Sequence, residues 1–279
     1  MIAAGRRDSG TAGASTLTEE PVSGELPRLE LARWRDELGL IAGITGRGRE
    51  AGPGFDLGLW SVAPVGEVMR RWRLFRAAMS EFSTVVLGNQ VHGTEVRSVG
   101  AYGGWIQVEG VDGWVTTSPG VLLTVTVADC IPVYLAVPGR GIALLHAGWR
   151  GTAGGIMARG VGALTAAVAA DPSDIVMHCG IGICGQCYEV GSEVVAGCGR
   201  TPDGAGPWHL DLREVLADQA SALGVGTVTC STHCSAHERP TFYSHRASRG
   251  ADGRMVAYLG IPEDGTHERV SIDSRGKPQ

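Results

Sequence analysis

The stretch between residues 113 and 146 constrains the fold most, because short apolar runs follow one another there with turn residues between them. Four runs predict extended segments: residues 113–115, 121–128, 131–137 and 141–146. A Ser118-Pro119-Gly120 turn separates the first two runs, and Pro138-Gly139 closes the last two into a hairpin. A sheet with at least one antiparallel pair is therefore expected.

The flanking segments mix helices with strands. Apolar residues recur at helical spacing over residues 65–81 and predict a helix there. A second helix is expected over residues 153–170 and ends before Asp171-Pro172. A third is expected over residues 211–223, with Asp211 as its N-terminal cap. Further strands are expected at residues 40–45, 84–87, 175–180, 225–230 and 255–261. Hairpins beside helices, without a regular βαβ repeat, predict an α+β fold with mixed sheets.

The 279 residues are enough for one large folded unit. The 43 glycines are about twice the usual share, and without a G-X-Y period they indicate tight turns and close backbone approaches. Residues 1–25 lack an apolar pattern and are expected to be a disordered tail. One folded domain is expected over residues 26–261, followed by a loose polar tail over residues 262–279.

Charge and hydropathy exclude several classes of protein. The chain has 24 Lys+Arg against 29 Asp+Glu, so it lacks the basic field of a nucleic-acid-binding protein. Apolar runs such as residues 121–127 are too short to span a bilayer, and no apolar core follows Arg6-Arg7 as in a secretory signal. Seven cysteines in a chain that is not exported are expected to be reduced thiols, and the protein is expected to be cytoplasmic.

Reactive side chains follow three of the predicted strands, in the strings NQVHG, ADCIP and HAGWRG. Because each follows a predicted strand, His92, Cys130 and His146 can meet at one edge of the sheets and form a reactive centre. Two imidazoles and a thiolate offer three ligands to Zn²⁺ and leave a fourth position for water, whose pKa the ion lowers toward 7. The long separations leave two other interpretations open, which are satisfied core residues and a Cys130 nucleophile activated by a histidine.

Two more groups of residues carry possible chemistry. Cys184-x₂-Cys187 with Cys230-x₃-Cys234 has the outline of a four-cysteine zinc site, but its glycine-rich turn favours reduced thiols that bind no metal. The loop that begins at His146 can present N–H groups to an anion, although it lacks the Lys-Ser/Thr ending of a nucleotide-binding P-loop. Three arginines could bind phosphate and a flat ring, one in this loop and two late in the chain beside aromatic residues: Arg150, Arg246 and Arg254.

Longer strings support a family resemblance. NQVHGTEV, DGWVTTSPGVLLTVTVADCIPVYL, ALLHAGWRGTAGGI and GIGICGQCYEVGSEV resemble the YfiH-type laccase-domain family in sequence and in order, over about residues 40–261. Members of that family were labelled polyphenol oxidases and are described as purine nucleoside enzymes. The resemblance implies a single α+β domain of mixed sheets layered with helices, and a zinc ion on His92, Cys130 and His146.

The resemblance also implies two reactions. One is phosphorolysis of adenosine, inosine, guanosine or methylthioadenosine to base and sugar 1-phosphate, and the other is deamination of adenosine to inosine. Arg47, Arg246 and Arg254 stand at the family's arginine positions, while Asp56-Leu57-Gly58 replaces its Asn-Leu-Gly. The implied partners are purine nucleosides and phosphate, without nucleic acid or membrane, for a monomer or homodimer.

Three alternative functions stay open. Two histidines and a cysteine can form a trigonal copper site, so one alternative is a copper-dependent, laccase-like polyphenol oxidase. Only eight histidines, and no His-x-His pair, argue against a multicopper enzyme. The second alternative is a cysteine hydrolase using Cys130 with a histidine, and the third is a non-enzymatic protein associated with the cell wall or division.

Overall fold

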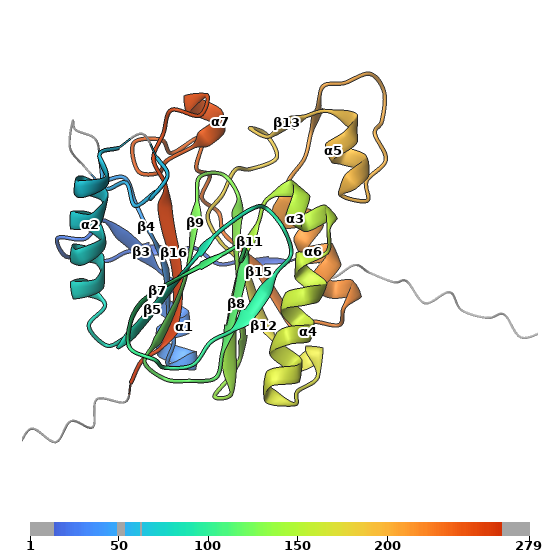
Figure 1. Ribbon diagram of the computed structural model, residues 1–279. Helices are drawn as coiled ribbons and strands as arrows, with labels where there is room; N and C mark the ends of the chain where they lie inside the picture. The colour runs from blue at the N-terminus through green and yellow to red at the C-terminus, as the bar shows by residue number, and fades with distance from the viewer. Residues whose placement is uncertain (1–13, 49–53, 62, 264–279) are drawn as a thin grey trace, which may run out of the picture.

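The computed structural model describes residues 14–48, 54–61 and 63–263. Two seven-stranded mixed sheets pack face to face, and helices cover their outer faces (Figure 1). The predicted α+β domain of mixed sheets layered with helices is confirmed.

The first sheet contains the predicted hairpin. Its strands, in spatial order, are β1 (Ser15–Thr16), β15 (Thr227–Cys230), β12 (Val176–Cys179), β10 (Ile131–Val137), β11 (Gly141–Ala147), β8 (Gly113–Thr116) and β6 (Val96–Ser98). The β10–β11 pair is antiparallel, with Pro132 opposite His146, whereas β12 and β15 run parallel. The hairpin register thus places the residues before β10 beside the end of β11.

The second sheet is also mixed. In spatial order it contains β2 (Glu20–Pro21), β3 (Arg28–Glu30), β4 (Ile41–Thr45), β16 (Met255–Ile261), β9 (Val121–Val127), β5 (Thr84–Asn89) and β7 (Gly104–Glu109). Because β5 and β9 are parallel neighbours, the loops that follow them leave the sheet at the same edge. A separate two-stranded sheet pairs β13 (Glu189–Val190) with β14 (Trp208–His209).

Seven α-helices lie in the described part of the chain: α1 (Ala32–Leu38), α2 (Val65–Ala78), α3 (Trp149–Ala153), α4 (Ile156–Val168), α5 (Ser192–Gly197), α6 (Leu212–Ala222) and α7 (His245–Ser248). A 3₁₀ turn covers Pro172–Asp174. Figure 1 shows α2 on the outside of the second sheet and α3, α4 and α6 on the outside of the first. None of the described helices combines the length and apolar character needed to cross a membrane.

The core explains why the central strands are apolar without interruption. Val133 and Leu135 of β10 pack with the helices α4 and α6, while Tyr134 and Ala136 of the same strand pack between the two sheets. Successive side chains of a strand point to opposite faces, so a strand covered on both faces has no solvent-facing position for polar residues. A third cluster of apolar residues fills the space between the second sheet and α2.

Two predicted boundaries differ from the structure. The helix expected over residues 153–170 is α4, which begins at Ile156 because the chain turns at Gly155, whose φ of 87° belongs to the left-handed region, and the short α3 before it was not expected. The tail expected over residues 1–25 contains β1 and β2, and Glu19 between them is buried. β1 is ordered by pairing with β15, which lies far away in sequence, and β2 by pairing with the nearby β3. Residues 1–13, and 264–279 of the expected C-terminal tail, lie outside the described residues.

Candidate functional site

A cavity of about 490 Å³ lies where the chain passes from β9 of one sheet to β10 of the other. Its lining includes the three reactive residues singled out above, three arginines and several aromatic rings: His92, Cys130, His146, Arg150, Arg246, Arg254, Trp60, Trp149 and Tyr188. The cavity therefore combines nucleophilic or metal-binding groups, cations and flat apolar surfaces.

The structure brings His92, Cys130 and His146 together at this cavity. One ligand atom of each lies within 4.8 Å of the others. Cys130 precedes β10, His146 belongs to the adjacent β11, and His92 follows β5. The His146 ring is buried, Cys130 is half-buried and His92 is exposed, so the cluster is reached from solvent on the His92 side.

Asp112 holds two parts of this cluster in place, and sequence reasoning missed it. Its buried carboxylate accepts a hydrogen bond from the backbone N–H of His92 at 3.0 Å and of Gly93 at 2.8 Å, and lies 2.9 Å from His146 Nδ1. When the ring is neutral, as it must be to bind a metal, a proton on Nδ1 donated to Asp112 leaves Nε2 as the lone-pair nitrogen of His146. The available signal was an acidic residue directly before the apolar segment at residues 113–115, inside one of the family strings.

The charges of the cluster favour a thiolate beside a protonated imidazole. Burial by itself would raise the pKa of Cys130, but His146 and His92 lower that pKa to about 6. Burial likewise opposes the charge on His146, but Cys130 and Asp112 raise the pKa of His146 to about 9. Hydrogen bonds from His146 and from backbone N–H groups lower the pKa of Asp112 against the effect of burial.

The backbone around the cluster is crowded and partly strained. A Cβ atom on Gly148 would lie 2.9 Å from His92 Cδ2 and 3.0 Å from Cys130 Sγ, so only glycine fits there. His92 and Asp129 both adopt positive φ, at 59° and 88°. Such conformations are unfavourable for residues with a side chain and cluster at functional sites.

Asp129 connects the cluster to two distant segments. Its carboxylate accepts hydrogen bonds of 2.6 Å from Ser235 Oγ and of 2.6 Å from the backbone N–H of Arg246. Its backbone carbonyl accepts from the N–H of Ile183 at 3.0 Å. These contacts fit the structural role expected for Asp129.

Three of the four predicted arginines line the cavity. The Arg150 guanidinium lies 4.5 Å from the ring centroid of Trp149, and that of Arg246 lies 4.9 Å from the centroid of Tyr188. Arg254 Nη1 donates to the carbonyls of the two preceding residues.

Arg47 does not line the cavity. It forms an ion pair of 2.6 Å with Asp252 and lies 4.3 Å from the ring centroid of Tyr243. Arg47 therefore differs from the other three arginines, because its guanidinium is paired with a carboxylate that does not line the cavity.

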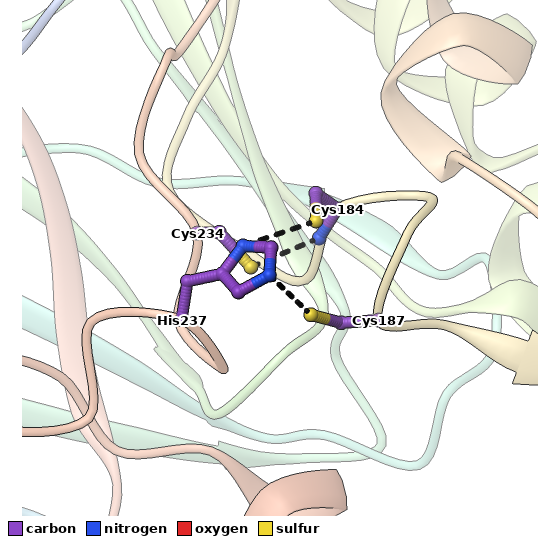
Figure 2. A group of neighbouring side chains, drawn as sticks. All are labelled: Cys184, Cys187, Cys234 and His237. Atoms are coloured by element: carbon purple, nitrogen blue, oxygen red, sulfur yellow. Dashed lines mark hydrogen bonds between the residues drawn. The ribbon is translucent and has the colours of Figure 1, made fainter.

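A second cluster contains Cys184, Cys187, Cys234 and His237, whose ligand atoms also lie within 4.8 Å of one another (Figure 2). This set of donors could hold a metal ion such as zinc. The sequence predicts reduced thiols that bind no metal here, and its spacing groups Cys230 with the other three cysteines. Cys230 instead lies opposite Cys179 in the β12–β15 pair. The fourth member of the cluster is His237 rather than Cys230.

Comparisons with known proteins agree with the fold and the motifs. The family model described as multi-copper polyphenol oxidoreductase laccase matches residues 48–262. The protein named purine nucleoside phosphorylase YlmD from Geobacillus stearothermophilus is 36% identical over 257 residues, which cover 82% of this chain and 92% of that protein. A purine nucleoside phosphorylase from Deinococcus radiodurans is 42% identical over 183 residues, covering 62% of this chain and 69% of that protein.

Solved structures give the same result. The crystal structure of YlmD from Geobacillus stearothermophilus has a TM-score of 0.78 at 30% identity, covering 88% of this chain and all of that one. The crystal structure of the Bacillus licheniformis hypothetical protein YfiH has a TM-score of 0.74 at 26% identity, covering 84% of this chain and 96% of that one. The chain therefore belongs to the multi-copper polyphenol oxidoreductase laccase family, the YfiH-type family that its motifs resemble.

Proposed function

We propose that this protein is a purine nucleoside phosphorylase that also deaminates adenosine to inosine. The observation that carries the proposal is that His92, Cys130 and His146 open onto the same cavity as Arg150, Arg246 and Arg254. The names of its relatives support the phosphorolytic reaction. The proposed substrates are adenosine, inosine, guanosine and methylthioadenosine, together with phosphate.

The donors at the cavity fit a zinc ion held by His92, Cys130 and His146. Two imidazoles and a thiolate are ligands that zinc prefers, and three protein ligands are typical of catalytic zinc sites. The contact between Asp112 and His146 Nδ1 is the carboxylate–histidine arrangement that orients metal ligands. When bound, zinc would supply a Lewis acid beside the substrate.

The chain's own residues would bind and orient the two substrates. Arg150, Arg246 and Arg254 would hold phosphate, because guanidinium groups bind phosphate oxygens through paired N–H donors. The exposed ring of Trp60, which lines the cavity, offers a flat surface to the purine. A volume of about 490 Å³ lies within the range typical of small-molecule sites.

A cysteine hydrolase is the second candidate, and a specific observation favours it. Cys130, His146 and Asp112 form a thiol–imidazole–carboxylate row, in which the imidazole promotes the thiolate and the carboxylate orients the imidazole. A copper-dependent polyphenol oxidase is the third candidate, since the same two histidines and cysteine can bind copper.

The proposed function is tested by incubating zinc-loaded protein with adenosine or inosine, with and without phosphate, and separating the products. We expect adenine and hypoxanthine with sugar 1-phosphate only when phosphate is present, and inosine from adenosine without it. Cys130→Ser should abolish both reactions, whereas Cys230→Ser, outside the cavity, should retain them. Absence of product under both conditions would overturn the proposal.

Two further measurements separate the candidates. A hydrolase would lose activity on alkylation of Cys130 and keep it in the presence of a chelator, whereas the proposed enzyme loses activity with the chelator. An intense thiolate-to-copper absorption band in the protein as isolated would favour the oxidase over the zinc enzyme.

A further inference from the structure

The second cluster combines two short motifs from distant parts of the chain. Cys184 and Cys187 belong to the loop between β12 and β13, and Cys234 and His237 belong to the segment between β15 and α7. Each pair has two residues between its members, which is the usual spacing within one half of a structural zinc site.

The four side chains point toward one another. The His237 imidazole lies between two sulfur atoms, with Cys187 Sγ at 3.2 Å from Nε2 and Cys184 Sγ at 3.7 Å from Nδ1 (Figure 2). Zinc bonds of about 2.3 Å to sulfur and about 2.0 Å to nitrogen place the ligands of a tetrahedral site about 3.5–3.8 Å apart. The four ligand atoms lie within 4.8 Å of one another, and since the ring presents a different nitrogen to each sulfur, His237 would turn to direct one nitrogen at a bound ion.

Backbone hydrogen bonds hold the two segments of the second cluster together. The N–H groups of Cys187 and Tyr188 donate to the Cys184 carbonyl, both at 3.0 Å, and this turn places the two cysteines on one side. The second segment is joined to the first by a parallel bridge between Gly182 and Cys234. Cys234 Sγ also accepts the N–H of Cys184 at 3.4 Å, a contact that favours a negatively charged sulfur.

We propose that Cys184, Cys187, Cys234 and His237 form a structural zinc site that fastens two walls of the cavity to each other. Three thiolates and an imidazole complete a tetrahedron, and sites with four protein ligands are structural because no position is left for a substrate. This site differs in that respect from the three-ligand cluster at His92, Cys130 and His146. All seven cysteines are free thiols, so no disulfide competes for these sulfur atoms.

The positions of the ligands in the chain explain what the zinc would hold. Ile183 and Tyr188, beside the first pair of cysteines, line the cavity. The second segment leads through Ser235, which is bonded to Asp129, to Arg246 of the cavity wall. Loss of the ion would therefore loosen both walls, while His92, Cys130 and His146 lie on other elements.

Zinc content tests the proposal separately from catalysis. Purified wild-type protein is expected to hold about two zinc ions per chain, and His146→Ala about one. In the His146→Ala background, the additional pair Cys184→Ser and Cys187→Ser should remove the remaining zinc. The matched change Cys230→Ser should leave it in place, since Cys230 lies outside the cluster. If the cavity cluster binds no zinc, wild type and His146→Ala should both hold about one ion, and the loss of that ion with Cys184→Ser and Cys187→Ser still tests the second cluster alone.

Cobalt supplies a spectroscopic measurement on the same proteins. We expect His146→Ala to bind one cobalt ion, with the intense visible bands of a tetrahedral thiolate site, and His237→Ala in that background to weaken them. His237 is exposed, so its loss is compatible with a folded protein, which circular dichroism checks. The proposal is overturned if folded His146→Ala binds neither zinc nor cobalt, or if zinc persists after both cysteines are replaced.

Discussion

Asp112 is completely buried, and its carboxylate lies within 3.2 Å of four nitrogen atoms. Three are backbone N–H groups of the loop that carries His92, and the fourth is Nδ1 of His146. A single carboxylate thus fixes both the loop and the orientation of the imidazole ring. This arrangement makes Asp112 a positioning residue for the candidate site.

Asp112→Asn should weaken zinc binding at the cavity. The amide cannot accept all four hydrogen bonds, and loss of a carboxylate partner of a metal-binding histidine typically costs about 10–100-fold in metal affinity. Competition with a chromogenic chelator, measured in the Cys184→Ser/Cys187→Ser background, isolates this ion. Asp36→Asn, at an exposed position of α1, is the control. An unchanged affinity in Asp112→Asn would contradict the role given to this carboxylate.

Arg150→Ala should raise the KM for phosphate by roughly 10–100-fold, because a hydrogen bond to a charged group contributes about 1.5–3 kcal/mol. Arg150 lines the cavity and stacks on Trp149, so its removal leaves the backbone contacts of Arg246 and Arg254 intact. Steady-state phosphorolysis at varied phosphate concentration measures the change. Arg159→Ala, an exposed arginine of α4, should behave like the wild type.

At the scale of elements, the candidate site is built from strand ends rather than from strand interiors. β5 and β9 end at one edge of the second sheet, and the turn at Asp129-Cys130 carries the chain to β10 of the first sheet. The following helical segment begins at Trp149 and is interrupted at Gly154-Gly155. This interruption lets α3 lie at the cavity while α4 packs along the first sheet.

Gly155→Ala should destabilise the protein by about 1 kcal/mol, since a residue with a Cβ atom is strained at φ 87° even though no atom lies within 4 Å of the added methyl group. Gly162→Ala is the matched control. A methyl group added at Gly162 also meets no atom within 4 Å, but this residue lies inside α4, so the substitution should stabilise the protein by about 0.5–1 kcal/mol. Urea denaturation measures both, and changes of the same sign would contradict the prediction.

At the scale of the whole molecule, buried polar contacts connect the N-terminal segment to the sheets. The chain passes from β1 in the first sheet to β2 in the second, and Glu19 lies buried at the crossing. The Glu19 carboxylate accepts a 2.6 Å hydrogen bond from Ser231 Oγ and lies 3.2 Å from His178 Nε2. Burial by itself would raise the pKa of Glu19, but His178 and Ser231 lower it below its usual value of 4.5.

Glu19→Gln should lower the free energy of unfolding at pH 7 by about 1–3 kcal/mol, the cost of leaving buried polar groups without their partners. Because the pKa of Glu19 is lowered in the folded state, its stabilising effect is complete above pH 4.5 and is lost as the pH falls through the folded-state pKa. The difference between variant and wild type should therefore shrink on acidification. Denaturant titrations at several pH values measure it, with the exposed neighbour Glu20→Gln as control.

The predictions that succeeded concern features set by residues that are close together in the chain. The β10–β11 hairpin and the Asp211 cap of α6 were predicted because turn residues and capping side chains act within a few positions. The edge strands β1, β2 and β6 were missed because strands of two or three residues carry little periodicity, and β1 in addition pairs with β15, which lies far away in sequence. The helix over residues 153–170 was confirmed as α4, whereas the short α3 before it was not predicted.

The sequence by itself determined the α+β class, the central strands and several residues that reach the cavity, among them His92, Cys130 and His146, because strand periodicity, turn chemistry and motif strings are local properties. Only the tertiary structure added Asp112 to the site and separated Arg47 from it. It also replaced Cys230 by His237 in the second cluster. These outcomes depend on sheet register and on the packing of distant segments, which bring together side chains that no local pattern relates.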